Sequence, residues 1–293
     1  MRLDIRYVTR FTYHQPVRES SNELRACPTT DDRQQLVSYR VITVPFSRIH
    51  TSVDHWGTRV DAFGIREPHT ELEVVAEAAV ETEPAAAMTA TPPLAALQDA
   101  AFRDAHAEYL QPTVHSRGGE AVDALAAELR AQASDDVTDL VFAVHEIIGH
   151  RLRYVTGSTE VGIDLEEVLQ RAEGVCQDYA HLFVALCRSL HIPARYVSGY
   201  LYTVDDSTGA DAEVDEVRVQ THAWGEAAIP GAGWWALDPT NRQDVSERHV
   251  KIGHGRDYDD VQPLKGAFSG PPAHDLEVEV AMRRLTAAQQ QQQ

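Results

Sequence analysis

The stretch that most constrains this chain is Gly174–Tyr202, where a glycine turn, a cysteine, a helical pattern and a strand pattern follow one another. After Cys176, apolar residues recur at helical spacing from Leu182 to Leu190. Ile192-Pro193 then breaks the helix, and the apolar, aromatic run that follows predicts a strand. Cys176 therefore lies at the first turn of a buried helix, where unpaired backbone N–H groups and the helix dipole favour a thiolate. Because the thiolate is the reactive form of cysteine, a base and an orienting group should be present elsewhere in the chain.

Two further residues supply the partners that a reactive cysteine needs. His222 lies in Thr221–Trp224, which is predicted to be a strand with Trp224 on the same face. Asp238 ends the following predicted strand, and Pro230–Gly233 between them has the composition of a hairpin turn. If these strands pair, His222 and Asp238 lie side by side, and they need only meet the helix start to form a triad. Each residue alone is weak evidence, because a lone cysteine or strand histidine is more often structural, but the ordered set is much stronger.

Composition narrows the classes of protein to be considered. A chain of 293 residues with 43% hydrophobic residues can bury a sizeable core and suggests two domains. Its 26 Lys and Arg against 45 Asp and Glu give a formal charge of −19, which disfavours nucleic acid and anionic lipid as partners. No stretch approaches the ~20 apolar residues of a membrane span, and the N-terminus lacks the apolar region of a secretory signal. We therefore expect no nucleic-acid partner, no membrane partner and a cytoplasmic location.

The cysteines and histidines limit the kinds of site further. Three cysteines are too few and too scattered for a disulfide framework, and no CxxC pair suggests a thiolate metal site. Cys27 and Cys187 are expected to be packed thiols. His145 and His150 resemble a zincin motif, but a spacing of five residues turns the second histidine by about 140° from the first. The sequence therefore predicts no metal and no cofactor.

The pattern along the chain predicts two domains, residues 1–83 and 84–293. The first alternates like short antiparallel strands, with Leu3, Ile5 and Tyr7 on one face. In the second, the acidic segment between Tyr202 and Glu216 is predicted to be solvated, with a functional lid as the alternative. A last strand over 276–282 is assigned to the second domain, and the tail Gln289–Gln293 is predicted to be disordered. Helices are predicted over 94–108, 119–133, 137–154 and 165–171, strands over 217–229 and 233–237, and mostly irregular structure over 241–272.

The sequence GVCQDYAHLFVALCRSLHIPARYVSGYL, followed by THAW and GWWALDPTN, resembles the bacterial transglutaminase-like family of the papain-like cysteine superfamily. GRDYDDVQPLKG downstream, and SNELRACP and DHWGTRVDAFG near the N-terminus, are similar to other motifs of that family and of its N-terminal β-domain. The resemblance implies an α+β fold in which a nucleophile helix packs on an antiparallel sheet, preceded by a small antiparallel β-domain. It also implies that Cys176 is the nucleophile, His222 the general base and acid, and Asp238 the orienting group. No acidic cluster matches the calcium sites of animal transglutaminases, so calcium dependence is not implied.

Other residues are candidates for contacts with the substrate. The backbone N–H of Cys176 is the natural first oxyanion donor, and Tyr154 and Gln177 are alternatives for the second. Tyr154 could instead only pack its ring beside the cysteine helix. Asp178 lies in the first helical turn, where a carboxylate is favourable for dipole reasons, or where it could bind a substrate amine. The remaining candidates are Trp224, as core or cleft wall, and Asp257 and Tyr258, as cleft border or loop anchor.

These residues predict a cysteine-dependent acyl-transfer enzyme that acts on amide or peptide bonds through a thioacyl intermediate. Hydrolysis by a peptidase or amidase is favoured, because no pocket for an acceptor amine can be recognised in the sequence. Protein-glutamine crosslinking is the alternative within the enzyme class, and a non-catalytic binding module is the alternative outside it. The expected partner is a peptide or protein substrate, and the oligomeric state cannot be derived from the sequence.

Overall fold

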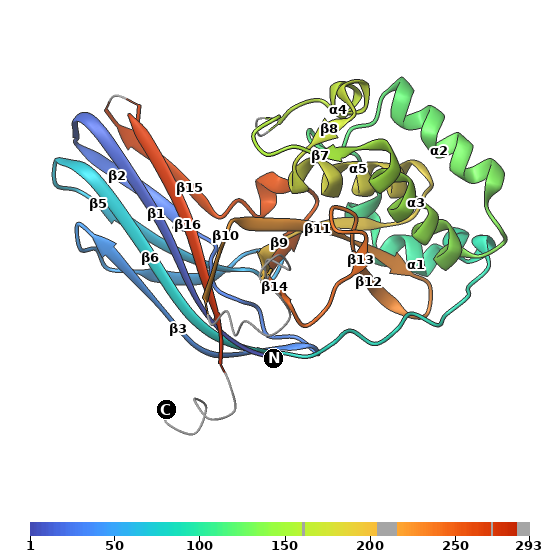
Figure 1. Ribbon diagram of the computed structural model, residues 1–293, viewed down its shortest axis with the longest axis horizontal. Coiled ribbons are helices and arrows are strands. Elements are labelled where there is room, and N and C mark those ends of the chain that lie inside the picture. Colours follow the sequence, from blue (N-terminus) through green and yellow to red (C-terminus); the bar gives the residue numbers. More distant parts are fainter. Residues whose placement is uncertain (160–161, 204–215, 271, 286–293) are drawn as a thin grey trace.

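The computed structural model describes residues 1–159, 162–203, 216–270 and 272–285. It has a β-sandwich at one end, a helical layer at the other and a further sheet between them (Figure 1). The cysteine helix packs on this middle sheet, whose strands are antiparallel. The predicted α+β class, with an N-terminal β-region before a transglutaminase-like core, is therefore confirmed.

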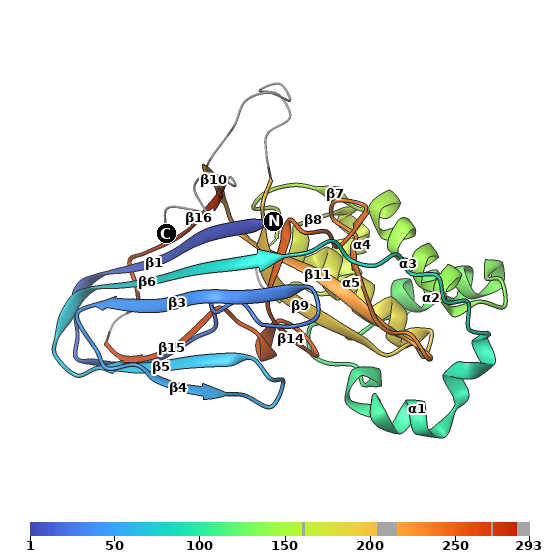
Figure 2. The same cartoon turned by 90° about the horizontal axis from the view of Figure 1, so that it is seen from below.

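Two antiparallel sheets form the sandwich, with strand orders β10-β16-β1-β6-β3 and β15-β2-β5-β4. Figure 2 shows β1, β6 and β3 in one layer above β15, β5 and β4 in the other. Leu3, Ile5 and Tyr7 of β1 all face the core, as their alternation predicts. The strands are β1 (Arg2–Val17), β2 (Glu19–Leu24), β3 (Gln34–Val44), β4 (His50–Val53), β5 (Arg59–Ile65), β6 (His69–Thr82), β10 (Glu216–Val219), β15 (Leu264–Ser269) and β16 (Asp275–Arg284).

The last strands belong to this sandwich, which corrects the assignment of residues 276–282 to the second domain. β16 pairs with β1 from Leu3 opposite Arg284 to Thr12 opposite Asp275. β15 pairs with β2, and β10 pairs with the free edge of β16. The apolar alternation predicts that a strand forms, but it does not predict which strand pairs with it. The limit between domains at residue 83 stays a prediction.

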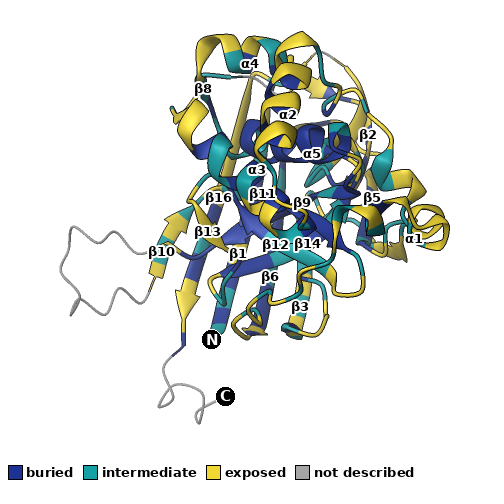
Figure 3. Ribbon diagram, turned by 90° about the vertical axis from the view of Figure 1, so that its right-hand side faces the viewer, coloured by how far each residue is buried: buried dark blue, intermediate teal, exposed yellow. Residues whose placement is uncertain are grey.

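The helical layer is built around α5 (Cys176–Ser189), which is buried along most of its length (Figure 3). Phe183 at its centre packs over Gly225 of the middle sheet, where a Cβ would lie 2.1 Å from the Phe183 ring. Only glycine allows the helix to approach the strand this closely. The other helical segments are η1 (Leu94–Gln98), α1 (Ala100–Ala105), η2 (Ala107–Leu110), α2 (Glu120–Gln132), α3 (Val137–Arg151) and α4 (Leu165–Arg171).

The middle sheet has the order β13-β12-β11-β9-β14 and joins the two ends of the molecule. Ala223 and Ala227 contribute to the core beneath α5. Tyr200, Val250 and Ile252 of the same sheet belong instead to the core of the sandwich. The strands are β9 (Ala194–Leu201), β11 (Thr221–Ile229), β12 (Gly233–Asp238), β13 (Gln243–Asp244) and β14 (His249–Gly255).

The structure corrects further boundaries. The predicted helix over 137–154 ends at Arg151, and β7 (Arg153–Tyr154) follows it. The predicted strand over 217–229 is two strands, because the chain leaves the sandwich after β10 and enters the middle sheet as β11. The region 241–272 was predicted to be mostly irregular, yet it contains β14 and β15, besides the short η4 (Tyr258–Asp260). A glycine in this region allows a side chain to pack closely on the backbone and need not indicate a turn. At Gly253 a Cβ would lie 2.3 Å from the Thr58 hydroxyl oxygen. The predicted helix over 94–108 is divided into η1, α1 and η2.

Two predictions concern residues outside the described part of the chain. These are the solvated acidic loop, of which 204–215 are not described, and the tail Gln289–Gln293. Within the described ranges, no helix is both long enough and apolar enough to cross a membrane.

The position of β16 in the sandwich predicts unequal effects of two truncations on the same strand. Met282 has no exposed surface, whereas Leu276 is 53% exposed. Met282→Ala should lower the free energy of unfolding by about 2–5 kcal/mol, because it leaves a cavity between the sheets. Leu276→Ala, the matched control, should change it by about 0.5 kcal/mol or less. Chemical denaturation measures both values, and equal losses would contradict this placement of β16.

Candidate active site

Cys176 is the first residue of α5, and two hydrogen bonds fix the start of this helix. The Asp178 carboxylate accepts one from the backbone N–H of Val175 at 2.8 Å and one from the Thr159 hydroxyl at 2.6 Å. The first of these is one half of a capping box, which makes the helix begin at a defined residue. The N–H of Cys176 has no acceptor within the helix, as is general for the first helical turn.

A cavity of about 490 Å³ lies over Cys176 and His222. Its walls come from Tyr154 of β7 (Arg153–Tyr154), from the end of β9, from residues 218–222 and from the turn after β12. The described lining residues include no Asp or Glu. Two of the residues that the sequence predicts to be catalytic therefore share one cavity.

The third predicted residue, Asp238, lies beside His222 on the paired strands β11 and β12. Leu237 is opposite Gly225, so the next residue, Asp238, falls diagonally across from His222 on the same face. The distance from His222 Nε2 to Asp238 Oδ2 is 2.8 Å, and the Asp238 side chain has no exposed surface. The hairpin predicted from Pro230–Gly233 thus brings these two side chains together.

Burial and hydrogen bonding oppose each other in setting the charges of this pair. Burial lowers the pKa of His222, but hydrogen bonds and charges from Asp238 and Cys176 outweigh it and raise that pKa to about 10. Burial raises the pKa of Asp238, but hydrogen bonds from His222 and His249 hold it well below its usual range. Because Nε2 of His222 bonds Asp238, Nδ1 is the ring atom left for Cys176. Because the pKa of His222 lies well above 7, its side chain is an imidazolium at neutral pH.

A second histidine, His249 of β14, shares the Asp238 carboxylate, and sequence reasoning missed it. Its Nε2 lies 3.1 Å from Asp238 Oδ2, and its Nδ1 accepts a hydrogen bond from the backbone N–H of Ser246 at 3.1 Å. Since Nδ1 is an acceptor, Nε2 carries the hydrogen that points at Asp238. Burial is the main reason that the pKa of His249 is lowered, which favours this neutral form. The only signal for it would have been the register of β14 on β9, in a region predicted to be mostly irregular.

The turn after β12 completes the surroundings of Asp238. Asn241 Nδ2 donates to Asp238 Oδ2 at 2.7 Å. The backbone N–H groups of Thr240 and Asn241 donate to Oδ1 at 3.0 and 3.3 Å. With the two histidines, five donors therefore surround one buried carboxylate and keep it ionised.

Within the described ranges, His222, Asp238 and His249 are the group whose ligand atoms lie close enough together, within 4.8 Å, to hold a metal ion. The Asp238 oxygen and both Nε2 atoms are engaged with one another in hydrogen bonds, and the side chains of Asp238 and His249 have no exposed surface. These contacts fit a hydrogen-bonded triad better than a metal centre. The zincin-like pair is separated: His145 is buried, whereas His150 is exposed.

The two candidates for the second oxyanion donor differ in placement. Tyr154 lines the cavity, and burial together with the charge of Cys176 raises the pKa of its hydroxyl. Gln177 is half-buried and is not among the lining residues. The geometry therefore favours Tyr154.

Asp178 and Trp224 are buried next to the site, and neither lines the cavity. Asp178 is 4% exposed, and its carboxylate caps the helix, so it does not face the cavity as a ligand for a substrate amine would. Trp224 is 1% exposed and stands edge-on to His249, with ring centroids 5.4 Å apart. Of its two predicted positions, Trp224 takes the one in the core.

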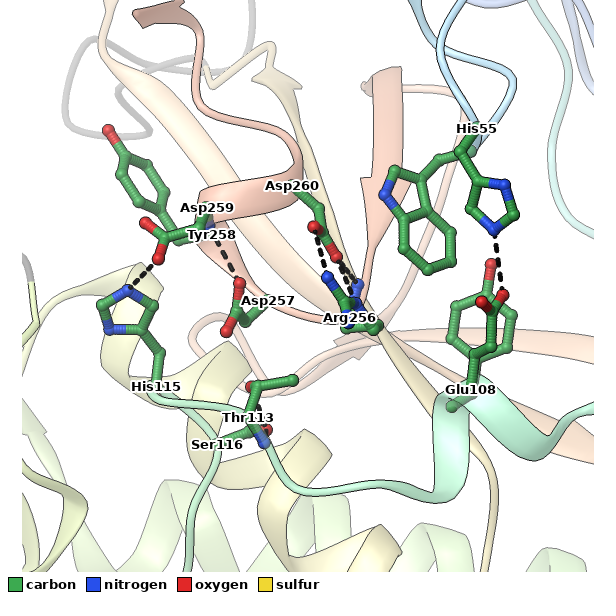
Figure 4. Close-up of polar contacts among 12 residues, drawn as sticks. His55, Glu108, Thr113, His115, Ser116, Arg256, Asp257, Tyr258, Asp259 and Asp260 are labelled. Atoms are coloured by element: carbon green, nitrogen blue, oxygen red, sulfur yellow. Dashed lines mark hydrogen bonds and ion pairs between the residues drawn. The ribbon is translucent and has the colours of Figure 1, made fainter.

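Asp257 and Tyr258 anchor a loop, which was one of their two predicted roles (Figure 4). The Asp257 carboxylate accepts a hydrogen bond from the backbone N–H of Asp259 at 3.0 Å. The backbone N–H of Tyr258 donates to His181 Nε2 at 3.2 Å. Neither residue lines the cavity over Cys176.

The other two cysteines are buried and unpaired, as predicted. Burial raises the pKa of Cys27 to about 11 and raises the pKa of Cys187 as well. Cys176 is the half-exposed cysteine of the three and lies at the cavity.

Comparison with known proteins agrees with this architecture. The model of the transglutaminase-like superfamily matches residues 123–239, and that of the bacterial transglutaminase-like N-terminal region matches residues 3–81. An uncharacterized protein of Mycobacterium leprae is 38% identical over 97% of this chain and 99% of its own length. An uncharacterized protein of Mycobacterium tuberculosis is 31% identical over 90% of this chain and 87% of its own length. The crystal structure of "a Putative Cysteine Protease from Cytophaga hutchinsonii" shares the fold, with a TM-score of 0.73, 23% identity and coverage of 98% and 92% of the two chains.

The chain therefore belongs to the transglutaminase-like superfamily and carries the bacterial transglutaminase-like N-terminal region. This confirms the family that its cysteine, histidine and aspartate motifs resemble.

Replacement of His249 tests how much its hydrogen bond to Asp238 contributes to stability. In His249→Leu the buried carboxylate loses one donor, so the free energy of unfolding should fall by about 1–3 kcal/mol. In His249→Gln, an amide nitrogen can donate from a position similar to Nε2, so most of that loss should be recovered. Thermal unfolding compares the two variants. An equal loss in both would show that His249 acts through packing and not through its hydrogen bond.

Proposed function

We propose that this protein is a cysteine-dependent enzyme that transfers acyl groups from amide or peptide bonds through a thioacyl intermediate. In this proposal Cys176 is the nucleophile, His222 is the general acid and base, and Asp238 orients His222. The observation that carries it is one arrangement: a half-buried cysteine at a helix start, in a cavity shared with a histidine that bonds a buried carboxylate at 2.8 Å. Nucleophile, base and orienting group then stand in the order that acyl transfer requires.

The proposed reaction begins with attack of the Cys176 sulfur on the carbonyl carbon, which places a negative charge on the carbonyl oxygen. When the C–N bond breaks, the proton on His222 Nδ1 passes to the leaving amine, and the acyl group remains on sulfur as a thioester. Neutral His222 then takes a proton from water or from an acceptor amine as that molecule attacks the thioester. Release of the acyl product restores the thiolate and the imidazolium, so the proton count balances over one turnover.

The charge on the carbonyl oxygen needs two donors. The backbone N–H of Cys176 is free of intrahelical bonds, because it opens α5. The Tyr154 hydroxyl is proposed as the second donor, since Tyr154 lines the same cavity, where burial and the charge of Cys176 raise the pKa of that hydroxyl.

Hydrolysis is proposed as the main outcome, with crosslinking as the alternative. A protein acceptor amine such as a lysine side chain carries a positive charge when it approaches the site. The described lining of the cavity includes Arg218 and no carboxylate, so it offers no attraction to such an acceptor. Water needs no such attraction.

The proposed partner is a peptide or protein substrate, and nucleic acid and membranes are not proposed as partners. The net charge of −19 supports this choice, because it repels polyanions. The cytoplasm is the proposed compartment, since all three cysteines are unpaired and a reducing environment preserves a nucleophilic thiol.

Variants of the three residues test the mechanism. Cys176→Ala and His222→Ala should abolish turnover of peptide amides, and Asp238→Ala should lower kcat by about 100-fold, because the imidazole loses its orientation. Mass spectrometry of a peptide panel, with and without an added primary amine, measures both turnover and the share of acyl groups that reach the amine. Circular dichroism should show that all three variants are folded. Full activity of Cys176→Ala would refute the mechanism, and complete transfer to the amine would replace hydrolysis by crosslinking.

The same samples separate an enzyme from a binding module of the same fold. Iodoacetamide should alkylate Cys176 much faster than the buried Cys187, because only Cys176 lies at a cavity beside an imidazolium. Equal, slow labelling of all three cysteines would favour the non-catalytic module.

The raised pKa of His222 predicts the alkaline limit of activity. His222 donates its proton to the leaving amine, so kcat/KM should decline as the pH rises through about 10, well above the ordinary value of 6.5. In Asp238→Asn the negative charge that holds this proton is removed, so the decline should begin at a lower pH. A pH–rate profile measures both limits, and a decline near neutral pH in the unmodified protein would contradict the ion pair.

A further inference from the structure

A second cavity adjoins the one over Cys176. It has a volume of about 670 Å³ and shares two lining residues, Tyr154 and Thr240, with the cavity of the proposed nucleophile. It lies between the end of α3, β7, β8 (Glu173–Gly174) and the end of α4. We call it the arginine pocket, because Arg151, Arg153, Arg171 and Arg242 line it.

The arginine pocket is positively charged in a chain that is otherwise acidic. Its described lining contains four arginines and one carboxylate, that of Glu173. Among its described lining residues the adjoining cavity adds Arg218, which pairs with Glu279, and no carboxylate. Over the whole chain the balance is the reverse, with 45 acidic residues against 26 basic ones. Arginine therefore outnumbers carboxylate in the described lining, and an excess of one sign of charge in a concave surface favours ligands of the opposite sign, here anions.

Three of the four arginines have glutamate partners that an anionic ligand can replace. Their side chains are 49%, 75% and 49% exposed, and ion pairs at such exposure contribute little to stability. A carboxylate of a ligand can bind a guanidinium through two parallel hydrogen bonds, which is the geometry that arginine favours. The pairs are Arg151 with Glu128, Arg153 with Glu173 and Arg171 with Glu167.

Arg242 differs from these three, since no carboxylate within the described ranges is paired with it. Its guanidinium donates to the carbonyl of Gly149 near the end of α3. A Cβ at Gly149 would lie 2.4 Å from Arg242 Nε, so a larger residue there would displace the Arg242 side chain. The backbone of Arg242 has a φ of 51°, a left-handed conformation that is strained for any residue other than glycine. Packing and backbone together hold one positive charge in the pocket, two residues from Thr240.

We propose that the substrate is a carboxylate-bearing peptide, whose acidic group binds in the arginine pocket while its reacting carbonyl lies at Cys176. The two cavities share Tyr154 and Thr240, so one ligand can contact both. This inference rests on the proposed function, because it names the substrate class of the same site. Arg242 is the specificity-determining residue, and Arg153, next to Tyr154, is the second contact.

The experiment measures how well short peptides protect Cys176 from iodoacetamide. Acetylated triglutamate amide offers side-chain carboxylates, acetylated trialanine acid offers only a terminal carboxylate, and acetylated triglutamine amide is neutral. We expect one of the carboxylate peptides to reach half-protection at a concentration at least tenfold below that of triglutamine. Whichever of the two does so identifies the carboxylate as that of a side chain or of the peptide terminus.

Arginine variants locate the binding group. Arg242→Gln, and independently Arg153→Gln, should reduce protection by the carboxylate peptide at least tenfold and leave the weak protection by triglutamine unchanged. The control is Arg130→Gln, an exposed arginine of α2 that lines neither cavity, and it should change nothing. Equal protection by all three peptides would overturn the inference. So would a loss of protection in Arg130→Gln as large as that in Arg242→Gln.

The rate without peptide separates this inference from the proposed function. If Cys176 is alkylated rapidly but the peptides are not distinguished, the anionic substrate is wrong and acyl transfer stands. If Cys176 reacts no faster than Cys187, acyl transfer is wrong, whatever the peptides do.

Discussion

The carboxylate of Asp238 is the group on which the geometry of the site depends. It receives hydrogen bonds from His222 of β11, from His249 of β14 and from the turn after β12. A buried charge is costly unless donors surround it, and these donors converge only when the strands of the middle sheet have their native register. Formation of the sheet and orientation of the imidazole are therefore one event. A shift of β14 or β11 would leave a buried carboxylate short of donors.

Close approach between backbone and side chains sets the distances around this carboxylate. Gly225 lets Phe183 of α5 lie directly on β11, and Gly199 lets the Trp224 ring lie against β9, where a Cβ would be 2.6 Å from that ring. The first contact fixes how far the cysteine helix stands from the histidine strand. The second fixes the ring that packs against His249. Interiors packed at this density transmit small displacements, so these glycines control the site although neither touches it.

Features that depend on neighbours along the chain can be predicted from this sequence, whereas features that depend on residues far apart in it cannot. The cysteine helix and the hairpin between His222 and Asp238 follow from periodicity and turn composition, because both depend on neighbours along the chain. His249 was missed because its role depends on the pairing of β14 with β9, in a segment where glycines indicate turns. Arg242 could not have been placed either, since its guanidinium meets Gly149 on a helix that lies 93 positions earlier in the chain. The partner of the last strand is equally non-local, because alternation is the same for every possible neighbour.

The order of strands in the sandwich has a consequence for how the chain is made. In Figure 1 the red strands β15 and β16 lie among the blue and cyan strands, since β16 borders β1 and β15 borders β2. During synthesis β1 and β2 therefore each keep one edge unpaired until the region between β6 and β15 has been made. Unpaired edges bind other strands readily, so this interval is when association with other chains is most favourable. The long separation between partners also makes closure of the sandwich a slow step in folding. The transglutaminase-like region lies between the first and last strands of the sandwich, so the sandwich can be completed only after that region has been synthesised.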